Sequence, residues 1–265
     1  MINNLVKTAI LTAWLCSAAY GQETYKIPTM EIILLGSGKT AVKSVEKELD
    51  IKGVIDALKS PDNYFREDTI RTLEWPQDWP EADRKALVAA MGERLSDEDP
   101  PVRYLAAKAV SLVGPDAVAV LPALMKTAGK RENYVQMFAI AAIGNIGPSA
   151  SPAIPVLRKD LDSDDRFTPM NASDSLARIG KEAVPALVEA LKSKKGVTQI
   201  YISDALASMG AEGNSAIPAL KEIAAGGDII SSNRAQRAID EIQHPTRSNL
   251  SYWIYGKRTD EKKAD

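Results

Sequence analysis

The sequence predicts an all-α fold, a right-handed α-solenoid of about six helix pairs, and two repeated patterns predict it. The first is the segment VRYLAAKAVSLVG at 102–114, whose apolar skeleton returns four times downstream. The second is a short apolar segment around a proline, which precedes each returning copy. Because two helices per repeat bury a core only when neighbouring repeats stack, a period this regular indicates a solenoid.

The first pattern describes the second helix of each pair. Its copies occupy 65–77, 102–114, 135–147, 168–180, 198–210 and 231–243, the last with a decaying pattern. At roughly 100° per residue, positions one, five, eight, nine and twelve share one face, and these positions are small or branched apolar residues in most copies. Glycine ends four copies, where a left-handed C-cap is expected, at 114, 147, 180 and 210.

The second pattern describes the first helix of each pair. Its four versions are centred on Pro122, Pro155, Pro185 and Pro218, which lie 33, 30 and 33 residues apart. Proline in the first turn of a helix does little harm, because the amides there have no partner within the helix. Each proline therefore marks the start of a helix that leads into the next copy of the first pattern.

The motif before the alanine-rich helix resembles the HEAT-repeat family, in particular its short variety associated with phycobilisome lyases. The residues that carry the resemblance are Asp99-Pro100-Pro101-Val102-Arg103, echoed by Asp62-Asn63-Tyr64-Phe65-Arg66, and it covers roughly residues 51–243. The arginine of the motif is replaced in the later repeats. A ladder of Asp–Arg pairs is therefore expected to be broken at Gln136, Pro169, Gln199 and Ser232.

The termini predict three further segments. Residues 1–21 have the positive start, apolar stretch and Ala-Tyr-Gly end of a cleaved secretory signal, which implies a periplasmic or secreted protein. A lipoprotein anchored at Cys16 and an uncleaved anchor are minority interpretations. Residues 22–50 are interpreted as a leader and a degenerate N-terminal helical cap, with 40–49 as an amphipathic helix. Residues 244–265 form a C-terminal tail.

Two aromatic segments admit more than one role. Trp75 and Trp79 alternate with prolines in the largest internal loop, which either folds back over the first repeat or presents a ligand platform. Tyr252-Trp253-Ile254-Tyr255 in the tail either caps the last helix pair or docks elsewhere. Covering an open end is the favoured role, because a terminal repeat exposes an apolar face unless something caps it.

Composition excludes several classes of function. The formal net charge is −2, and removal of the signal takes away Lys7 alone, so there is no electrostatic case for nucleic acid or for an anionic membrane. Cys16 is the only cysteine and His244 the only histidine, which leaves no catalytic triad, thiol chemistry or zinc site. The acidic run from Asp160 to Asp165 is interpreted as helix capping rather than as a calcium site. No cofactor or metal is expected.

The candidate site is the face of the second helices that points away from their buried face. Position three, expected in solvent, is apolar in four consecutive repeats, and position seven carries charges of both signs along the stack. In the family this helix lines the concave surface, so the resemblance implies a groove there. The predicted partner-binding residues are Tyr104, Met137, Met170, Ile200, Lys108, Asp174 and Asp204. The competing interpretation is that loops or the tail cover these residues.

These observations predict a non-catalytic, exported interaction scaffold that binds a protein or peptide, without nucleic acid and without membrane insertion after signal cleavage. Two alternatives come from other classes. One is an enzyme or enzyme subunit like the lyase and hydroxylase relatives of HEAT-repeat proteins, although the His-Glu pairs that such a hydroxylase uses for iron are absent from this sequence. The other is a purely structural protein of the cell envelope.

Overall fold

The structure is a computed structural model of the chain and describes residues 25–35, 39–49, 51–73, 80–226 and 228–244. The predicted signal, the Trp75–Trp79 segment and the aromatic run of the tail lie outside the described residues. Contacts divide the chain into two units, residues 1–53 and 54–265, and each is described by itself.

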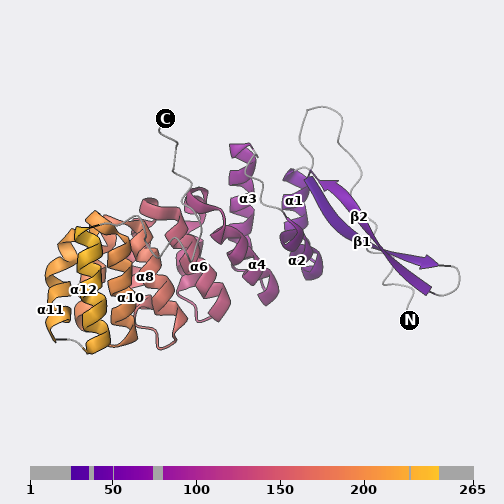
Figure 1. Cartoon of the computed structure of the whole chain (residues 1–265). Coiled ribbons are helices and arrows are strands. Elements are labelled where there is room, and N and C mark those ends of the chain that lie inside the picture. Colours follow the sequence, from indigo (N-terminus) through magenta and orange to yellow (C-terminus); the bar gives the residue numbers. More distant parts are fainter. Residues whose placement is uncertain (1–24, 36–38, 50, 74–79, 227, 245–265) are drawn as a thin grey trace. The chain divides into compact units, whose positions relative to one another are not determined.

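The N-terminal unit contains a β-hairpin. Strand β1 (Tyr25–Leu35) pairs antiparallel with β2 (Lys39–Leu49), in a register that places Tyr25 opposite Leu49 (Figure 1). The prediction of a helix over 40–49 was therefore wrong. Short apolar segments are ambiguous between helix and strand. The β-branched residues of both segments, among them Ile32 opposite Val42, favour an extended conformation, and β1 pairs with this segment as a neighbouring strand.

The second unit begins inside its first helix, which starts at residue 51. Together with residues 51–53, its described residues form six consecutive helix pairs. This confirms the predicted solenoid and its number of repeats. The pairs are α1 (Ile51–Leu58) and α2 (Asn63–Thr72), α3 (Glu81–Arg94) and α4 (Pro100–Ser111), α5 (Leu121–Ala128) and α6 (Asn133–Ile146), α7 (Ile154–Asp160) and α8 (Phe167–Ile179), α9 (Val184–Ser193) and α10 (Val197–Ser208), and α11 (Ile217–Gly226) and α12 (Ile229–Gln243).

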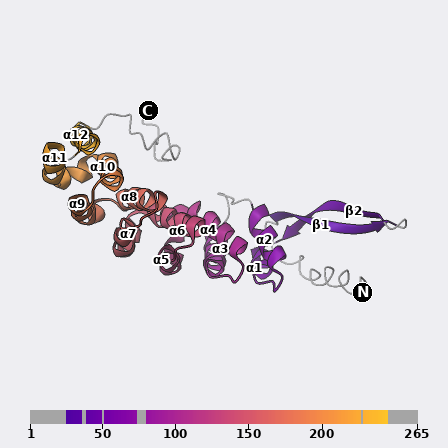
Figure 2. The same ribbon diagram turned by 90° about the horizontal axis from the view of Figure 1, so that it is seen from below.

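The helices from α3 onward lie in two rows. Each second helix packs against the next, in the order α4, α6, α8, α10 and α12. The first helices α3, α5, α7, α9 and α11 form the other row (Figure 2). A 3-10 segment joins most pairs: η1 (Gly114–Val120), η2 (Gly147–Ala153), η3 (Lys181–Ala183) and η4 (Gly210–Ala216). Four glycines after the second helices have positive φ: Gly114, Gly147, Gly180 and Gly210. At Gly147 and Gly180 ψ is −145° and −155°, so these two glycines adopt a positive-φ conformation other than the predicted left-handed C-cap.

The core lies between the two rows and uses the predicted face of the second helices. The fifth and ninth residues of every copy from α4 to α12 are at most 4% exposed. Tyr134–Asp160 is also long and apolar enough to meet a length-and-composition test for a membrane span. Here it forms α6, η2 and α7 within the stack, and burial inside the solenoid accounts for its apolar character.

The approach of α6 to α8 depends on a residue without a side chain. A Cβ atom on Gly144 would lie 2.7 Å from the Ser175 Oγ atom and 2.8 Å from the Ser175 Cα atom. The Ser175 hydroxyl donates a buried hydrogen bond of 2.9 Å to the Ile140 carbonyl on the facing helix. Small residues at these positions therefore let two helix backbones come close enough for a side chain of one to bond the backbone of the other.

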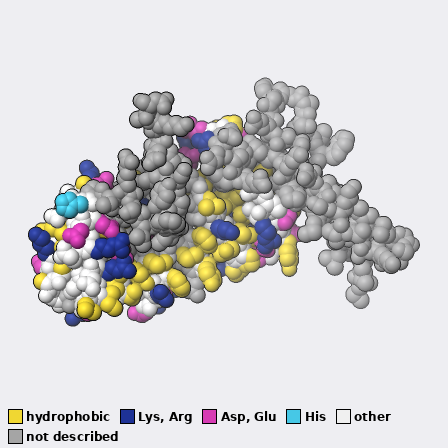
Figure 3. Space-filling view, in the orientation of Figure 1, with side chains coloured by type: hydrophobic (Ala, Val, Ile, Leu, Met, Phe, Trp, Pro, Cys, Tyr) yellow, Lys and Arg dark blue, Asp and Glu magenta, His cyan; other side chains and the backbone are white. Residues whose placement is uncertain are grey.

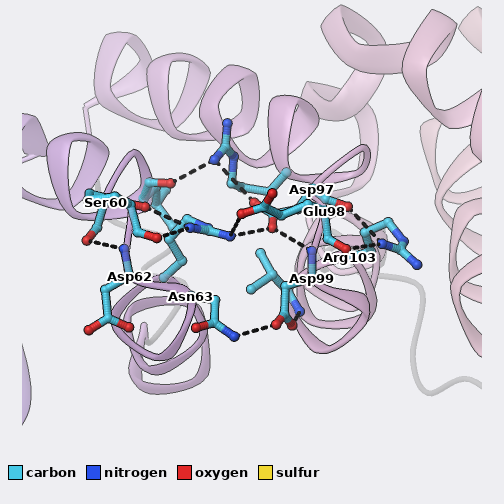
Figure 4. A network of polar contacts seen from close by, with 12 residues as sticks. Ser60, Asp62, Asn63, Asp97, Glu98, Asp99 and Arg103 are labelled. Atoms are coloured by element: carbon cyan, nitrogen blue, oxygen red, sulfur yellow. Dashed lines mark hydrogen bonds and ion pairs between the residues drawn. The ribbon is translucent and has the colours of Figure 1, made fainter.

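A polar ladder joins the early repeats at the turns before the second helices (Figure 4). Arg66 Nη2 donates to Asp97 Oδ1 at 2.7 Å, and both side chains are at most 4% exposed. Burial opposes ionisation of Asp97, but hydrogen bonds from Arg66 and from the Asp99 amide hold the pKa of Asp97 below its ordinary value. One repeat later, Arg103 Nε donates to Glu132 at 2.8 Å and Nη1 to the Asp97 carbonyl at 2.8 Å.

The ladder breaks at the third rung, as the sequence predicts. Gln136 Nε2 is the donor there, and its 3.4 Å contact with Asp160 Oδ1 is long. Asp160 Oδ2 is buried without a hydrogen-bond partner, and burial raises the pKa of Asp160 to about 7. Asp165, by contrast, caps α8 by accepting from the Phe167 and Thr168 amides. Capping is thus confirmed for Asp165, whereas Asp160 is a buried carboxyl group.

Gly144→Ala is expected to destabilise the protein, although alanine normally favours a helix, because the new methyl group meets the backbone of α8. A penalty of about 1–3 kcal/mol is typical of such overpacking. Gly226→Ala is the matched control, since nothing lies within 4 Å of the added Cβ atom. Unfolding followed by circular dichroism at 222 nm checks both, and an unfolding midpoint of Gly144→Ala equal to or above wild type contradicts the packing argument.

Asp160→Asn is expected to stabilise the protein above neutral pH and to have little effect near pH 4. The pKa of Asp160 is about 7 in the folded chain against 3.8 ordinarily, so its contribution to stability is full below pH about 4 and is lost as pH rises to about 7. The loss approaches about 1.4 kcal/mol per pH unit. Urea midpoints measured from pH 4 to 8 check this.

Asp162→Asn is the control for that series, with the opposite sign. Hydrogen bonding to Lys194 lowers the pKa of Asp162, so this carboxylate stabilises the fold at pH values above its unfolded pKa. The Asp162→Asn variant is therefore expected to be less stable than wild type at neutral pH. If the urea midpoints of wild type and Asp160→Asn change with pH in parallel, Asp160 is not a buried carboxyl group without a partner.

Candidate functional site

The most prominent surface feature of the solenoid is a row of exposed apolar side chains in the first turns of successive second helices. Tyr134 is 69% exposed, Phe167 60%, Val197 51% and Ile230 58%. Figure 3 shows hydrophobic side chains gathered along the lower edge of the solenoid, in the orientation of Figure 1. We call Tyr134, Met137, Phe167, Met170, Val197, Ile200 and Ile230 the apolar band.

Position three contributes to this band, as the sequence predicts, but less strongly than expected. Met170 is 38% exposed, whereas Met137 and Ile200 are half-buried. Each of the three follows a more exposed apolar residue by three positions on the same helix. Residues three apart on a helix are neighbours, so each pair makes one wider apolar surface per repeat.

Tyr104 is tied into an aromatic cluster between α4 and α6. Its ring lies edge-on to Tyr134, with centroids 6.4 Å apart, and to Phe138, with centroids 5.6 Å apart. Edge-to-face pairs of this kind stabilise by about 0.5–1.5 kcal/mol each beyond the area they bury. Tyr104 is half-buried, and the cluster forms the end of the apolar band rather than a separate anchor.

The charges at position seven are largely paired within the chain. Asp174 accepts from Arg178 Nε at 2.8 Å, and Asp204 accepts from Arg234 Nη1 at 3.2 Å. Burial raises the pKa of Asp204 despite the positive charges of Arg234 and Arg237. Lys108 on α4 is exposed. The flank of the apolar band at α8 and α10 is therefore acidic but partly neutralised.

A second polar ladder runs along the C-terminal halves of the same helices. Asn145 Nδ2 donates to the Ser111 carbonyl at 2.7 Å, and Arg178 Nη1 donates to Asn145 Oδ1 at 2.9 Å. The second-helix face is thus divided. Its C-terminal half is bonded between repeats by polar groups, while its N-terminal half presents the apolar band to solvent.

The most exposed members of the band are not among the residues predicted from the sequence. Tyr134, Phe167, Val197 and Ile230 stand directly before the first position of their copies, so the repeat alignment stopped one residue short of them. The signal was present, because a large apolar or aromatic residue stands at this position before five of the six copies: Tyr64, Tyr134, Phe167, Val197 and Ile230. The structure also shows why the position matters: it starts the helix, at the edge of the stack.

No group of three or more His, Cys, Asp or Glu side chains is arranged to hold a metal ion within the described residues. His244, which follows α12, is exposed, and its amide donates to the Asp240 carbonyl at 2.8 Å. The described face of the second helices offers apolar and aromatic contact with flanking charge.

The solved structures similar to this chain include two engineered proteins and a designed armadillo-repeat protein. An engineered protein is 24% identical with a TM-score of 0.51, covering 73% of this chain and 96% of its own; a second is 23% identical with a TM-score of 0.51, covering 73% and 58%. A computationally designed armadillo-repeat protein for modular peptide recognition is 19% identical with a TM-score of 0.49, covering 72% and 99%. These likenesses concern the fold alone.

No curated protein matches the sequence. The family model for HEAT repeats matches residues 51–132, 93–168 and 121–198, which together span more than half of the chain. The matched span includes the Asp–Arg motifs and the alanine-rich second helices. The chain therefore belongs to the HEAT-repeat family.

Proposed function

We propose that this protein is a non-catalytic interaction module that binds a protein or peptide partner along the apolar band. The observation that carries the proposal is the repetition of the band: four successive second helices each present at least one large, exposed apolar residue in the first turn. Single exposed apolar residues are ordinary on protein surfaces, but a contiguous row of them is typical of interaction sites.

The energetics support binding through a few anchors. Burial of apolar surface contributes about 25 cal/mol per Å², so Tyr134 and Phe167, which are both more than half exposed, have most to gain from a partner. Because Asp174 and Asp204 already have cationic neighbours, the partner's contribution at the flank is mainly specificity and orientation. Apolar side chains spaced to match successive helices are therefore the partner's expected feature.

The enzymatic alternative, a lyase-like or hydroxylase-like role, has no observation in its favour on the described surface. Such a role requires a chromophore or a metal held by a dedicated set of side chains. Purification with a bound chromophore or metal at one equivalent per chain would revive this alternative.

We also propose that the protein is exported, on the strength of the pattern at residues 1–21. N-terminal sequencing of the protein from the periplasm or medium is expected to start at Gln22. A mature protein that keeps Met1 and stays in the cytoplasm contradicts export, and an N-terminus at a lipidated Cys16 establishes the lipoprotein alternative.

Met137→Lys combined with Met170→Lys is expected to abolish partner capture, because each lysine places a charge in the middle of the apolar band. The helices should persist, since Met137 is only half-buried and Met170 is exposed. In the measurement, the mature chain is crosslinked to its neighbours in an extract of its source cells and pulled down, and mass spectrometry identifies the captured proteins. Circular dichroism checks that the variant keeps its helices.

Leu112→Lys combined with Val118→Lys is the matched control. These residues are 70% and 43% exposed and lie outside the apolar band, so this variant is expected to retain the partner. If the Met137 and Met170 variant still captures the partner, the binding site lies outside the apolar band. This holds whether or not the Leu112 and Val118 variant also captures it.

A further inference from the structure

The tail contains apolar residues that the solenoid end does not need. The chain continues for 21 residues after His244, and Tyr252-Trp253-Ile254-Tyr255 is the apolar part of that tail. An open solenoid end would use such a run as a cap. After the first turn of α12, where Ile229 and Ile230 are exposed, the exposed residues of the helix are polar: Asn233, Gln236, Arg237, Asp240 and Gln243.

The polar face of α12 is moreover satisfied within the helix. Gln236 Nε2 donates to Asp240 Oδ1 at 3.0 Å, and Arg237 Nε donates to Glu241 at 2.7 Å. Aromatic rings placed over these groups would cover hydrogen-bonded polar side chains without an apolar surface in return. The aromatic run therefore gains more by burial against apolar surface elsewhere, and the apolar band supplies that surface.

The tail is long enough to reach the apolar band. Going back from the end of α12 to the first turn of the neighbouring α10 covers about 20 Å along the helix and about 9 Å across, or roughly 22 Å. Eight residues from His244 to Tyr252 span up to about 26 Å when extended. Val197 and Ile200 are thus within reach of Tyr252, and Phe167 and Met170 on α8 are within reach of the next three residues.

The tail carries basic residues, and the flank of the apolar band carries two carboxylates that Arg178 and Arg234 already neutralise in part. Lys257 and Arg258 closely follow the aromatic run. Asp174 and Asp204 lie four residues after Met170 and Ile200, one turn further along the same helix faces. The Asp204 side chain is 46% exposed beside Arg234, so a further cation from the tail can reach it and stabilise its ionised form.

We propose that residues 252–258 of the tail dock on the apolar band of their own chain at α8 and α10, with the aromatic run on Phe167, Met170, Val197 and Ile200 and the basic pair beside Asp174 and Asp204. The docked tail occupies the surface assigned above to the partner and so competes with it. The competition rests on the proposed function, whereas docking of the tail does not.

The test places a photo-crosslinking amino acid, p-benzoylphenylalanine, at Ile200 in the full chain. The matched control carries it at Lys192, an exposed residue of α9 in the other row of helices. Irradiated monomer is digested and the crosslinked peptides are identified by mass spectrometry. An equal mixture of light and isotopically heavy chains separates links within one chain from links between two copies.

We expect the Ile200 probe to link to residues 249–258 within one chain, and the Lys192 probe not to do so. Trp253→Asp is expected to remove the link, because it puts a charge on the apolar surface while leaving the solenoid sequence unchanged. Absence of the tail link from the Ile200 probe, links of mixed isotope only, or equal linking from both probes overturns docking in cis.

Competition is read separately from docking. In the pull-down described above, Trp253→Asp is expected to increase partner recovery severalfold over wild type, and equal recovery overturns competition. If no partner is lost by the Met137 and Met170 variant while the tail link persists, the proposed function fails and tail docking stands. If that variant loses the partner and the tail link is absent, tail docking fails and the proposed function stands.

Discussion

The close packing of successive second helices is the constraint on which the rest of the structure depends. Where α6 meets α8, Gly144 leaves no room for even a methyl group, and Ser175 bonds the backbone of the facing helix. Helices held this closely are fixed in register, so a residue at a given position of one repeat lies beside its counterpart in the next. The apolar band and both polar ladders are rows because of that register.

The two polar ladders change along the stack. In the early repeats Arg66 and Arg103 join neighbouring repeats through acidic partners, whereas Gln136 leaves Asp160 buried and poorly bonded. Breaking a buried pair by loss of one partner is costly, because the remaining charge is uncompensated. The third rung is therefore a weak joint, and ionisation of Asp160 weakens it further as pH rises. The ladder of Asn145 and Arg178 on the second-helix face joins the same repeats.

The exposed apolar residues stand out because the solenoid already buries its core without them. The fifth and ninth residues of each second helix complete that core, and the first-turn residues lie on the other side of the helix. Keeping Phe167 and Val197 in solvent gives the isolated fold nothing, which favours a role in contact with another segment. A partner and the protein's own tail have the same apolar chemistry to offer, and this shared requirement is what makes competition between them testable.

The sequence alone determined the solenoid, the six helix pairs, the buried faces and the break in the Asp–Arg ladder. Each of these follows from a pattern repeated every 30 to 37 residues, in which neighbouring copies reinforce the same interpretation. Tertiary structure decided what has no such repetition. Residues 40–49 satisfy a helical period but form a strand that pairs with β1. Tyr104 packs into an aromatic cluster because α6 brings Tyr134 and Phe138 to it. The exposure of residues one place before each copy depends on where the helix starts in three dimensions, and a pattern of side-chain types does not contain that information.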